Sequence, residues 1–138
     1  MPSTDGKART DDAALRELIA HWAKAVRDEN LPGIRANHDP NILMFDVPPP
    51  FLSRGLDAYM ATWAKFYPSQ ARPVTFDFAD VEITAGNDVA FATAIGRCVY
   101  IERSGKNIDL KFRLTMGFRK QHGQWCVVHE HHSLPATD

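Results

Sequence analysis

The sequence predicts an α+β domain: a cone-shaped, curved antiparallel sheet with three N-terminal helices on its concave face. Up to Pro68, apolar residues recur mainly at the spacing of an α-helix, and after Pro73 they recur at every second position, as in strands. Helices that precede a run of strands are typical of α+β domains, in which the helices gather on one face of the sheet. We expect a sheet curved around helices to leave a cavity at the open end of the cone.

Length and composition fit one globular domain. The 138 residues are 44% apolar and 24% charged, and 16 basic against 17 acidic side chains leave a net charge of −1. There is no basic excess for a nucleic-acid backbone, and no apolar run reaches the roughly 20 residues that span a bilayer. The start, "MPSTDGKART", lacks the apolar centre of a signal peptide. We therefore expect a cytoplasmic protein without nucleic-acid or membrane partners, in which Cys98 and Cys126 are reduced.

The first half of the chain predicts helices. One runs from Asp11 to about Glu29, capped by Thr10 or Asp11, and residues 32–38 are expected to add a short second helix. The third follows Gly55 and ends before Pro68. We expect residues 1–9 to form a flexible N-terminal tail, 10–135 the single domain and 136–138 a C-terminal tail.

The second half predicts strands. A short buried strand at 42–45 comes first and is ended by "DVPPP", since proline cannot donate to a ladder. Four long strands follow, with a tight two-residue turn at His122-Gly123 before the last of them. Their expected ranges are 74–84, 89–102, 108–118 and 125–133.

Four stretches resemble the nuclear transport factor 2-like superfamily, and within it the SnoaL-like and ketosteroid-isomerase-like proteins. They are "ELIAHWAKAVRDENLPGI", "NILMFDVPPPFLSRGLDAYMATW", "NDVAFATAIGR" and "FRKQHGQWCVVHEHHSLP". The resemblance covers the chain from about Asp12 to Pro135 and implies the cystatin-like cone. It is specific for the fold but weak for the reaction, because the superfamily holds isomerases, cyclases, dehydratases and binding proteins.

Asp46 is the strongest candidate for a catalytic residue. It ends a buried strand and is followed by "VPPP", which has few backbone donors to satisfy a carboxylate. A carboxylate beside apolar walls has a raised pKa, which suits a general base. The resemblance points to the same residue, since the catalytic aspartate of ketosteroid isomerases stands at this strand end. The alternative is that Asp46 caps the following turn.

The resemblance does not extend to the oxyanion hole of ketosteroid isomerases. In those enzymes a tyrosine and a protonated aspartic acid stabilise the dienolate oxygen. The resemblance aligns Trp22 with the tyrosine and Met116 with the acid. A thioether cannot donate a hydrogen bond, so steroid isomerisation is not expected.

The segment "WCVVHEHHSLP" (125–135) concentrates histidines, but alternate side chains of a strand lie on opposite faces. With a tight turn at His122-Gly123, Met116 lies opposite His129. The family resemblance places Met116 in the cavity, so His129 and His131 are expected there, as proton carriers or as half-buried structural residues. A zinc site is less favoured, because H-x-H supplies two ligands and zinc needs three or four; His38 or Asp46 would have to complete the set.

Glu130 and His132 are then expected on the outer face of the sheet, which in this superfamily commonly forms a homodimer interface. Arg97 and Arg113 lie on neighbouring strands and have two possible roles. The first role is an ion pair with Glu130 on the outer face. The second is a contact with an acidic ligand at the cavity mouth. If the pairing of the last strand is shifted by one residue, the side chains assigned to the outer face lie on the cavity face instead.

Aromatic side chains are expected to line the cavity from the helix side. Small residues on the facing strand, Ala90 to Gly96, leave space opposite them, although aromatic residues at helical spacing are also typical of plain core. This pattern favours a pocket for a flat apolar or aromatic compound. No glycine-rich phosphate motif precedes a helix, so no cofactor is expected. The expected cavity residues are Trp22, Phe45, Tyr59 and Trp63.

Two functions remain open from the sequence. The first is cofactor-free acid–base chemistry on a small carbonyl compound (isomerisation, cyclisation, dehydration or hydration), with Asp46 as base and His129 or His131 as second proton carrier. The second is a ligand-binding or dimeric assembly module without turnover, which would hold a small acid through Arg97 or Arg113. Only the enzyme needs Asp46 inside the cavity.

Overall fold

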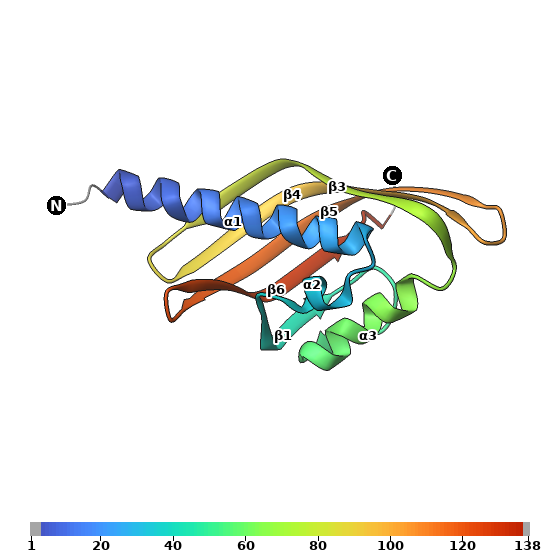
Figure 1. The fold of residues 1–138 in the computed structure, drawn as a ribbon, viewed down its shortest axis with the longest axis horizontal. Helices are drawn as coiled ribbons and strands as arrows, with labels where there is room; N and C mark the ends of the chain where they lie inside the picture. Colours follow the sequence, from blue (N-terminus) through green and yellow to red (C-terminus); the bar gives the residue numbers. More distant parts are fainter. Residues whose placement is uncertain (1–3, 137–138) are drawn as a thin grey trace.

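The computed structural model describes residues 4–136 and confirms the predicted fold class. One curved, six-stranded sheet carries its helices on the concave face (Figure 1). The helices are α1 (Thr4–Arg27), α2 (Leu31–Arg35) and α3 (Leu56–Phe66). The strands are β1 (His38–Phe45), β2 (Ser53–Arg54), β3 (Gln70–Ala85), β4 (Val89–Glu102), β5 (Asn107–Gln121) and β6 (Gln124–Ser133).

The strands lie in the order β2-β1-β6-β5-β4-β3. The four long strands pair with their chain neighbours and are antiparallel, as predicted. β1 is the exception, because it lies parallel to β6, with Phe45 opposite His131. This parallel pairing places the end of β1, and therefore Asp46, beside the histidine-rich end of β6.

Helix α1 starts earlier than the sequence predicts. It begins at Thr4, inside the stretch expected to be a tail, so the predicted N-cap at Thr10 or Asp11 is wrong. The buried Asp11 carboxylate instead accepts a hydrogen bond from Trp125 Nε1 (3.2 Å) and pairs with Lys120 Nζ (3.0 Å). The apolar stripe starts only at Leu15, so it could not mark the turns before it. Residues 1–3 and 137–138 of the expected tails lie outside the described residues.

The core fills the space between α1, α3 and the concave face of the sheet. Trp22, Tyr59 and Met116 are almost completely buried in it. The space predicted above Ala90 to Gly96 is partly taken by Phe112: a Cβ on Gly96 would lie only 2.3 Å from the Phe112 ring. Gly96 is therefore needed for close approach of an aromatic side chain, and the open cavity lies elsewhere.

A β-bulge in β6 decides which side chains face the core. The turn at His122-Gly123 has positive φ angles (53° and 78°), as predicted, and Phe118 lies opposite Val127. Further along, Gly117 lies opposite His129 and Met116 opposite Glu130. Val128 is thus an extra residue in β6, and such a bulge exchanges the two faces of a strand beyond it.

Candidate functional site

A cavity of about 610 Å³ lies between α3, the loop from Asp46 to Leu52 and the concave face of the sheet. Its walls are mainly apolar and aromatic, and Asp46 and His132 supply polar groups. Arg54 and Lys65 also line it. The apolar wall residues include Val47, Leu52, Trp63, Phe66, Phe76, Leu110 and Phe112.

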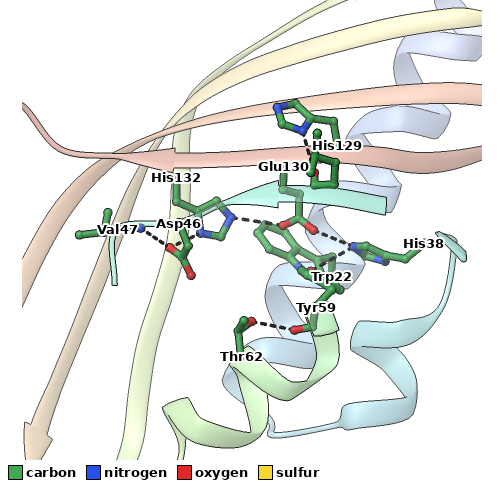
Figure 2. A network of polar contacts seen from close by, with 10 residues as sticks. Trp22, His38, Asp46, Val47, Tyr59, Thr62, His129, Glu130 and His132 are labelled. Carbon is green, nitrogen blue, oxygen red and sulfur yellow. Dashed lines mark hydrogen bonds and ion pairs between the residues drawn. The ribbon is translucent and has the colours of Figure 1, made fainter. Parts of the chain in front are cut away.

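Asp46 lies where the sequence predicts, at the end of β1 and in the cavity wall. Its Oδ1 accepts a hydrogen bond from the backbone N of Val47 (2.8 Å) and lies 3.4 Å from Nδ1 of His132 (Figure 2). No described residue donates a hydrogen bond to Oδ2, and no described arginine pairs with the carboxylate. The side chain is 23% exposed. Oδ1 is therefore held by its two contacts, whereas Oδ2 can contact a molecule in the cavity.

His132 is the partner of Asp46 and is buried among aromatic rings. Trp22, Trp63 and Phe112 lie with their ring centroids 5.7–6.4 Å from its imidazole. Burial alone would lower the pKa of His132, but hydrogen bonds to Asp46 and Glu130 outweigh it and raise the pKa to about 9. The residue is therefore an imidazolium at neutral pH, with a carboxylate at each ring nitrogen.

Glu130 lies behind His132, with a side chain that is 0% exposed. Its Oε1 is 3.3 Å from Nε2 of His132 and its Oε2 is 3.0 Å from Nε2 of His38. Burial would raise the pKa of Glu130, but hydrogen bonds to the two histidines outweigh it and lower the pKa to about 2. Glu130 is therefore a buried carboxylate held between two imidazoles.

The network continues from His38 into the core. Nδ1 of His38 donates to the carbonyl oxygen of Ala36 (2.9 Å), and its Nε2 lies 3.1 Å from the Tyr59 hydroxyl. Nε1 of Trp22 donates to that hydroxyl (3.0 Å). Burial, together with the charge of Glu130, raises the pKa of Tyr59 well above its ordinary value, so the hydroxyl keeps its proton.

The fold and the sequence identify the family. The family model for the SnoaL-like domain matches residues 15–137. The chain belongs to the SnoaL-like family, within the nuclear transport factor 2-like superfamily. A nuclear transport factor 2-like protein of unknown function from Pseudomonas putida KT2440 is 34% identical, with a TM-score of 0.83 over 92% of this chain and 88% of that one.

More distant structures share the fold. A putative scytalone dehydratase from Novosphingobium aromaticivorans is 14% identical, with a TM-score of 0.83 over 94% of this chain and 87% of that one. A putative dehydratase from Streptomyces avermitilis is 15% identical, with a TM-score of 0.78 over 91% and 97%. No curated protein matches the sequence. At such identities the likeness describes the fold of the SnoaL-like domain and leaves its reaction open.

His129 and His131 lie on the outer face of this SnoaL-like domain, so their predicted cavity position is wrong. Figure 2 shows His129 on the opposite side of β6 from Glu130 and His132. Nδ1 of His129 donates to the carbonyl oxygen of Leu43 (2.6 Å), and His131 is exposed. The bulge at Val128 explains the exchange, since it shifts each later residue of β6 to the other face.

Phe45 does not line the cavity, although the sequence predicts it there. Its ring lies against His129 and His131 on the outer face, with centroids 4.9 and 5.4 Å apart. The parallel register of β1 on β6 puts the three side chains together.

Arg97 and Arg113 contact neither Glu130 nor the cavity. Both guanidinium groups lie on the outer face: Arg97 Nη2 is 2.7 Å from Asp109, and Arg113 Nε donates to Ser133 Oγ (3.1 Å). Glu130 lies on the inner face of the sheet, so neither arginine pairs with it. Neither arginine lines the cavity, so neither contacts a ligand there.

The remaining predicted ligand-binding residues divide between cavity and core. Trp63 lines the cavity of the SnoaL-like domain, and its buried Nε1 has no hydrogen-bond partner among the described residues. Trp22, Tyr59 and Met116 face inward, as predicted, but pack in the core behind the cavity and are not part of its lining.

Sequence reasoning missed several residues of the site. The sequence predicts Glu130 and His132 on the outer face and indicates His38 only as a metal ligand, whereas all three belong to the buried network. Cys98 and Tyr100 of β4 also line the cavity. Their positions can be predicted from the sequence, because they continue the alternation of inward-facing residues along β4. Burial raises the pKa of the Cys98 thiol to about 11, so Cys98 is not a thiolate nucleophile at neutral pH.

Two further observations concern residues 4–136. Among residues 10–136 the chain contains no group of three or more His, Cys, Asp or Glu side chains arranged to hold a metal ion. None of the helices within residues 4–136 is long and apolar enough to cross a membrane.

Proposed function

We propose that this SnoaL-like protein is a cofactor-free acid–base enzyme that acts on a small apolar or aromatic carbonyl compound. The observation that carries the proposal is the Asp46–His132 pair in the wall of an apolar cavity, with Oδ2 of Asp46 free to accept a proton. Removal of a proton from the carbon next to a carbonyl is the shared first step of many isomerisations, cyclisations and dehydrations. A positioned carboxylate supplies the base for that step.

In the proposed mechanism, Oδ2 of Asp46 takes the proton, and the electron pair of the broken C–H bond moves to the carbonyl oxygen to form an enolate. The positive charge of His132, buried beside the cavity, stabilises this anion and the transition state before it. Asp46 then returns the proton to another carbon in an isomerisation. In a dehydration it gives the proton to a departing hydroxyl group, which leaves as water.

The walls of the cavity support the proposed substrate class. Phe66, Phe76, Phe112 and Trp63 offer flat aromatic surfaces, and a volume of about 610 Å³ suits a compound of one to three rings. The non-catalytic alternative would hold a small acid through Arg97 or Arg113, but these guanidinium groups contact Asp109 and Ser133 instead of the cavity. We also propose that this outer face forms a homodimer, because three apolar side chains of β4, Val89, Phe91 and Ile101, are each at least 50% exposed on it.

The test is hydrogen–deuterium exchange at the α-carbons of 2-tetralone, a flat bicyclic ketone, followed by NMR in D₂O. The protein is expected to accelerate exchange above the rate in buffer. His132→Gln is expected to lower the accelerated rate about 100-fold, because it removes the charge that stabilises the enolate. His131→Gln is the matched control and is expected to stay within twofold of the natural protein. Equal effects of the two substitutions would contradict the proposal.

A further inference from the structure

We propose that Glu130, anchored by His38, is a positioning residue that holds His132 as an imidazolium beside Asp46 and so sets the upper pH limit of the site. Neither Glu130 nor His38 lines the cavity. Both would act on a substrate only through His132. The catalytic part of this inference rests on the proposed function, whereas its physical part, the charge state of His132, does not.

The hydrogen bonds of His38 orient its ring toward Glu130. A carbonyl oxygen can only accept, so Nδ1 of His38 carries the proton that it shares with Ala36. Nε2 lies within hydrogen-bond distance of a carboxylate oxygen of Glu130 (3.0 Å) and of the Tyr59 hydroxyl (3.1 Å). His38 therefore anchors Glu130 through a contact in which neither side chain is exposed.

Tyr59 and Trp22 hold His38 in place. The Tyr59 ring stacks on the His38 ring with 4.9 Å between centroids, and its hydroxyl accepts from Nε1 of Trp22. Because the hydroxyl and the imidazole are both held, Nε2 of His38 stays directed at Glu130. The anchor therefore comes from three separate elements: α1, β1 and α3.

The surroundings of His132 show why Glu130 matters. The titratable groups that face its imidazole are Asp46, from the end of β1, and Glu130, from β6 itself. The other groups packed on the ring are Trp22, Trp63 and Phe112, which carry no charge. Of the two carboxylates, Asp46 is partly exposed and takes up a proton in the reaction, so its charge is transient. Glu130 supplies the negative charge that persists through the cycle.

The four side chains form a row of polar contacts from the core to the cavity. His38 lies against Glu130, Glu130 against His132 and His132 against Asp46, over contacts of 3.0, 3.3 and 3.4 Å. No lysine or arginine among residues 10–136 contacts either carboxylate of this row. Buried charges are retained only when they are paired, so the loss of one member is expected to change the charge state of its neighbour.

The test is an NMR titration of ¹³C- and ¹⁵N-labelled histidine rings, which needs no substrate. In the natural protein both ring nitrogens of His132 are expected to stay protonated up to about pH 9. Glu130→Gln is expected to lower the pKa of His132 by at least one unit, and Glu130→Asp to restore part of the difference. His38→Gln is expected to raise the pKa of Glu130, read from its carboxyl ¹³C signal.

A second measurement separates positioning from mere structural support. In Glu130→Gln the upper limb of the pH–rate profile for α-proton exchange is expected to move to lower pH with the His132 titration. A purely structural role would lower the rate equally at every pH and would overturn the proposal. So would a neutral His132 at pH 7.5 in the natural protein, which can be observed even if Glu130→Gln does not fold. If His132 is charged but exchange is not catalysed, the proposed function fails and the role of Glu130 stands.

Discussion

Replacing Asp46 by asparagine is expected to lower the rate of α-proton exchange about a thousandfold. An amide keeps the shape of the carboxyl group and its hydrogen bond from Val47, but it has no basic oxygen to take a proton. The loss is expected in kcat, with little change in KM, because the cavity walls that bind the ring system are untouched. The measurement is exchange into 2-tetralone at saturating ketone, with circular dichroism to confirm the fold.

Asp109→Asn is the matched control for this substitution. It removes one carboxylate that pairs with Arg97 on the outer face, away from the cavity. A rate within twofold of the natural protein is expected. If Asp46→Asn kept more than a tenth of the rate, another group would be the base, and the mechanism would have to be abandoned.

The stability of the protein is expected to peak between pH 4.5 and 6.5. The pKa of His132 is about 9 in the folded protein against 6.5 ordinarily, so its stabilisation is complete below pH 6.5 and is lost as the pH rises through 9. The pKa of Glu130 is about 2 against 4.5, so its stabilisation is complete above pH 4.5 and is lost as the pH falls through 2. Each difference corresponds to about 3 kcal/mol, and the two share one contact and do not add.

Urea unfolding at pH 6 and at pH 10 measures the alkaline part of this curve. The natural protein is expected to lose about 3 kcal/mol of unfolding free energy between the two. His132→Gln serves as the control, because it cannot lose the proton in question. A loss as large in His132→Gln as in the natural protein would show that other groups cause the decline.

The sequence predicts the architecture well because local rules decide it. The apolar stripe from Leu15 to Val26 defines the buried part of α1, and the prolines after Asp46 end β1. Two residues with positive φ at His122-Gly123 form the tight turn before β6. Each of these signals depends on neighbours in the chain, so it can be recognised without the tertiary structure.

The faces of β6 could not be predicted by the same rules. Val127 and Val128 are both apolar, so the sequence does not show which of them continues the inward alternation. The bulge depends on partners distant in sequence: His38 on β1 contacts Glu130, and Asp46 at the end of β1 contacts His132. These contacts pair the buried polar groups of Glu130 and His132. A register that ignores these partners puts His129 and His131 inside instead.

Asp46 has a position that local signals predict, whereas the position of His132 depends on long-range strand pairing. The position of Asp46 follows from a strand end and a proline-rich loop, both of which are local. The position of His132 follows from a single extra residue in β6 and from the parallel pairing of β1 with β6. The part of the site that depends on long-range pairing is therefore the part that the sequence misplaced.

We expect substrates to react where the apolar cavity ends, at Asp46 and His132. A crystal structure of the Asp46→Asn protein with 2-tetralone would show where the ketone binds. It is expected between Phe76, Phe112 and Trp63, with an α-carbon about 3 to 3.5 Å from the side chain at position 46. A ketone bound beside His129 and His131 on the outer face, with the cavity left closed to it, would rule out a reaction at Asp46.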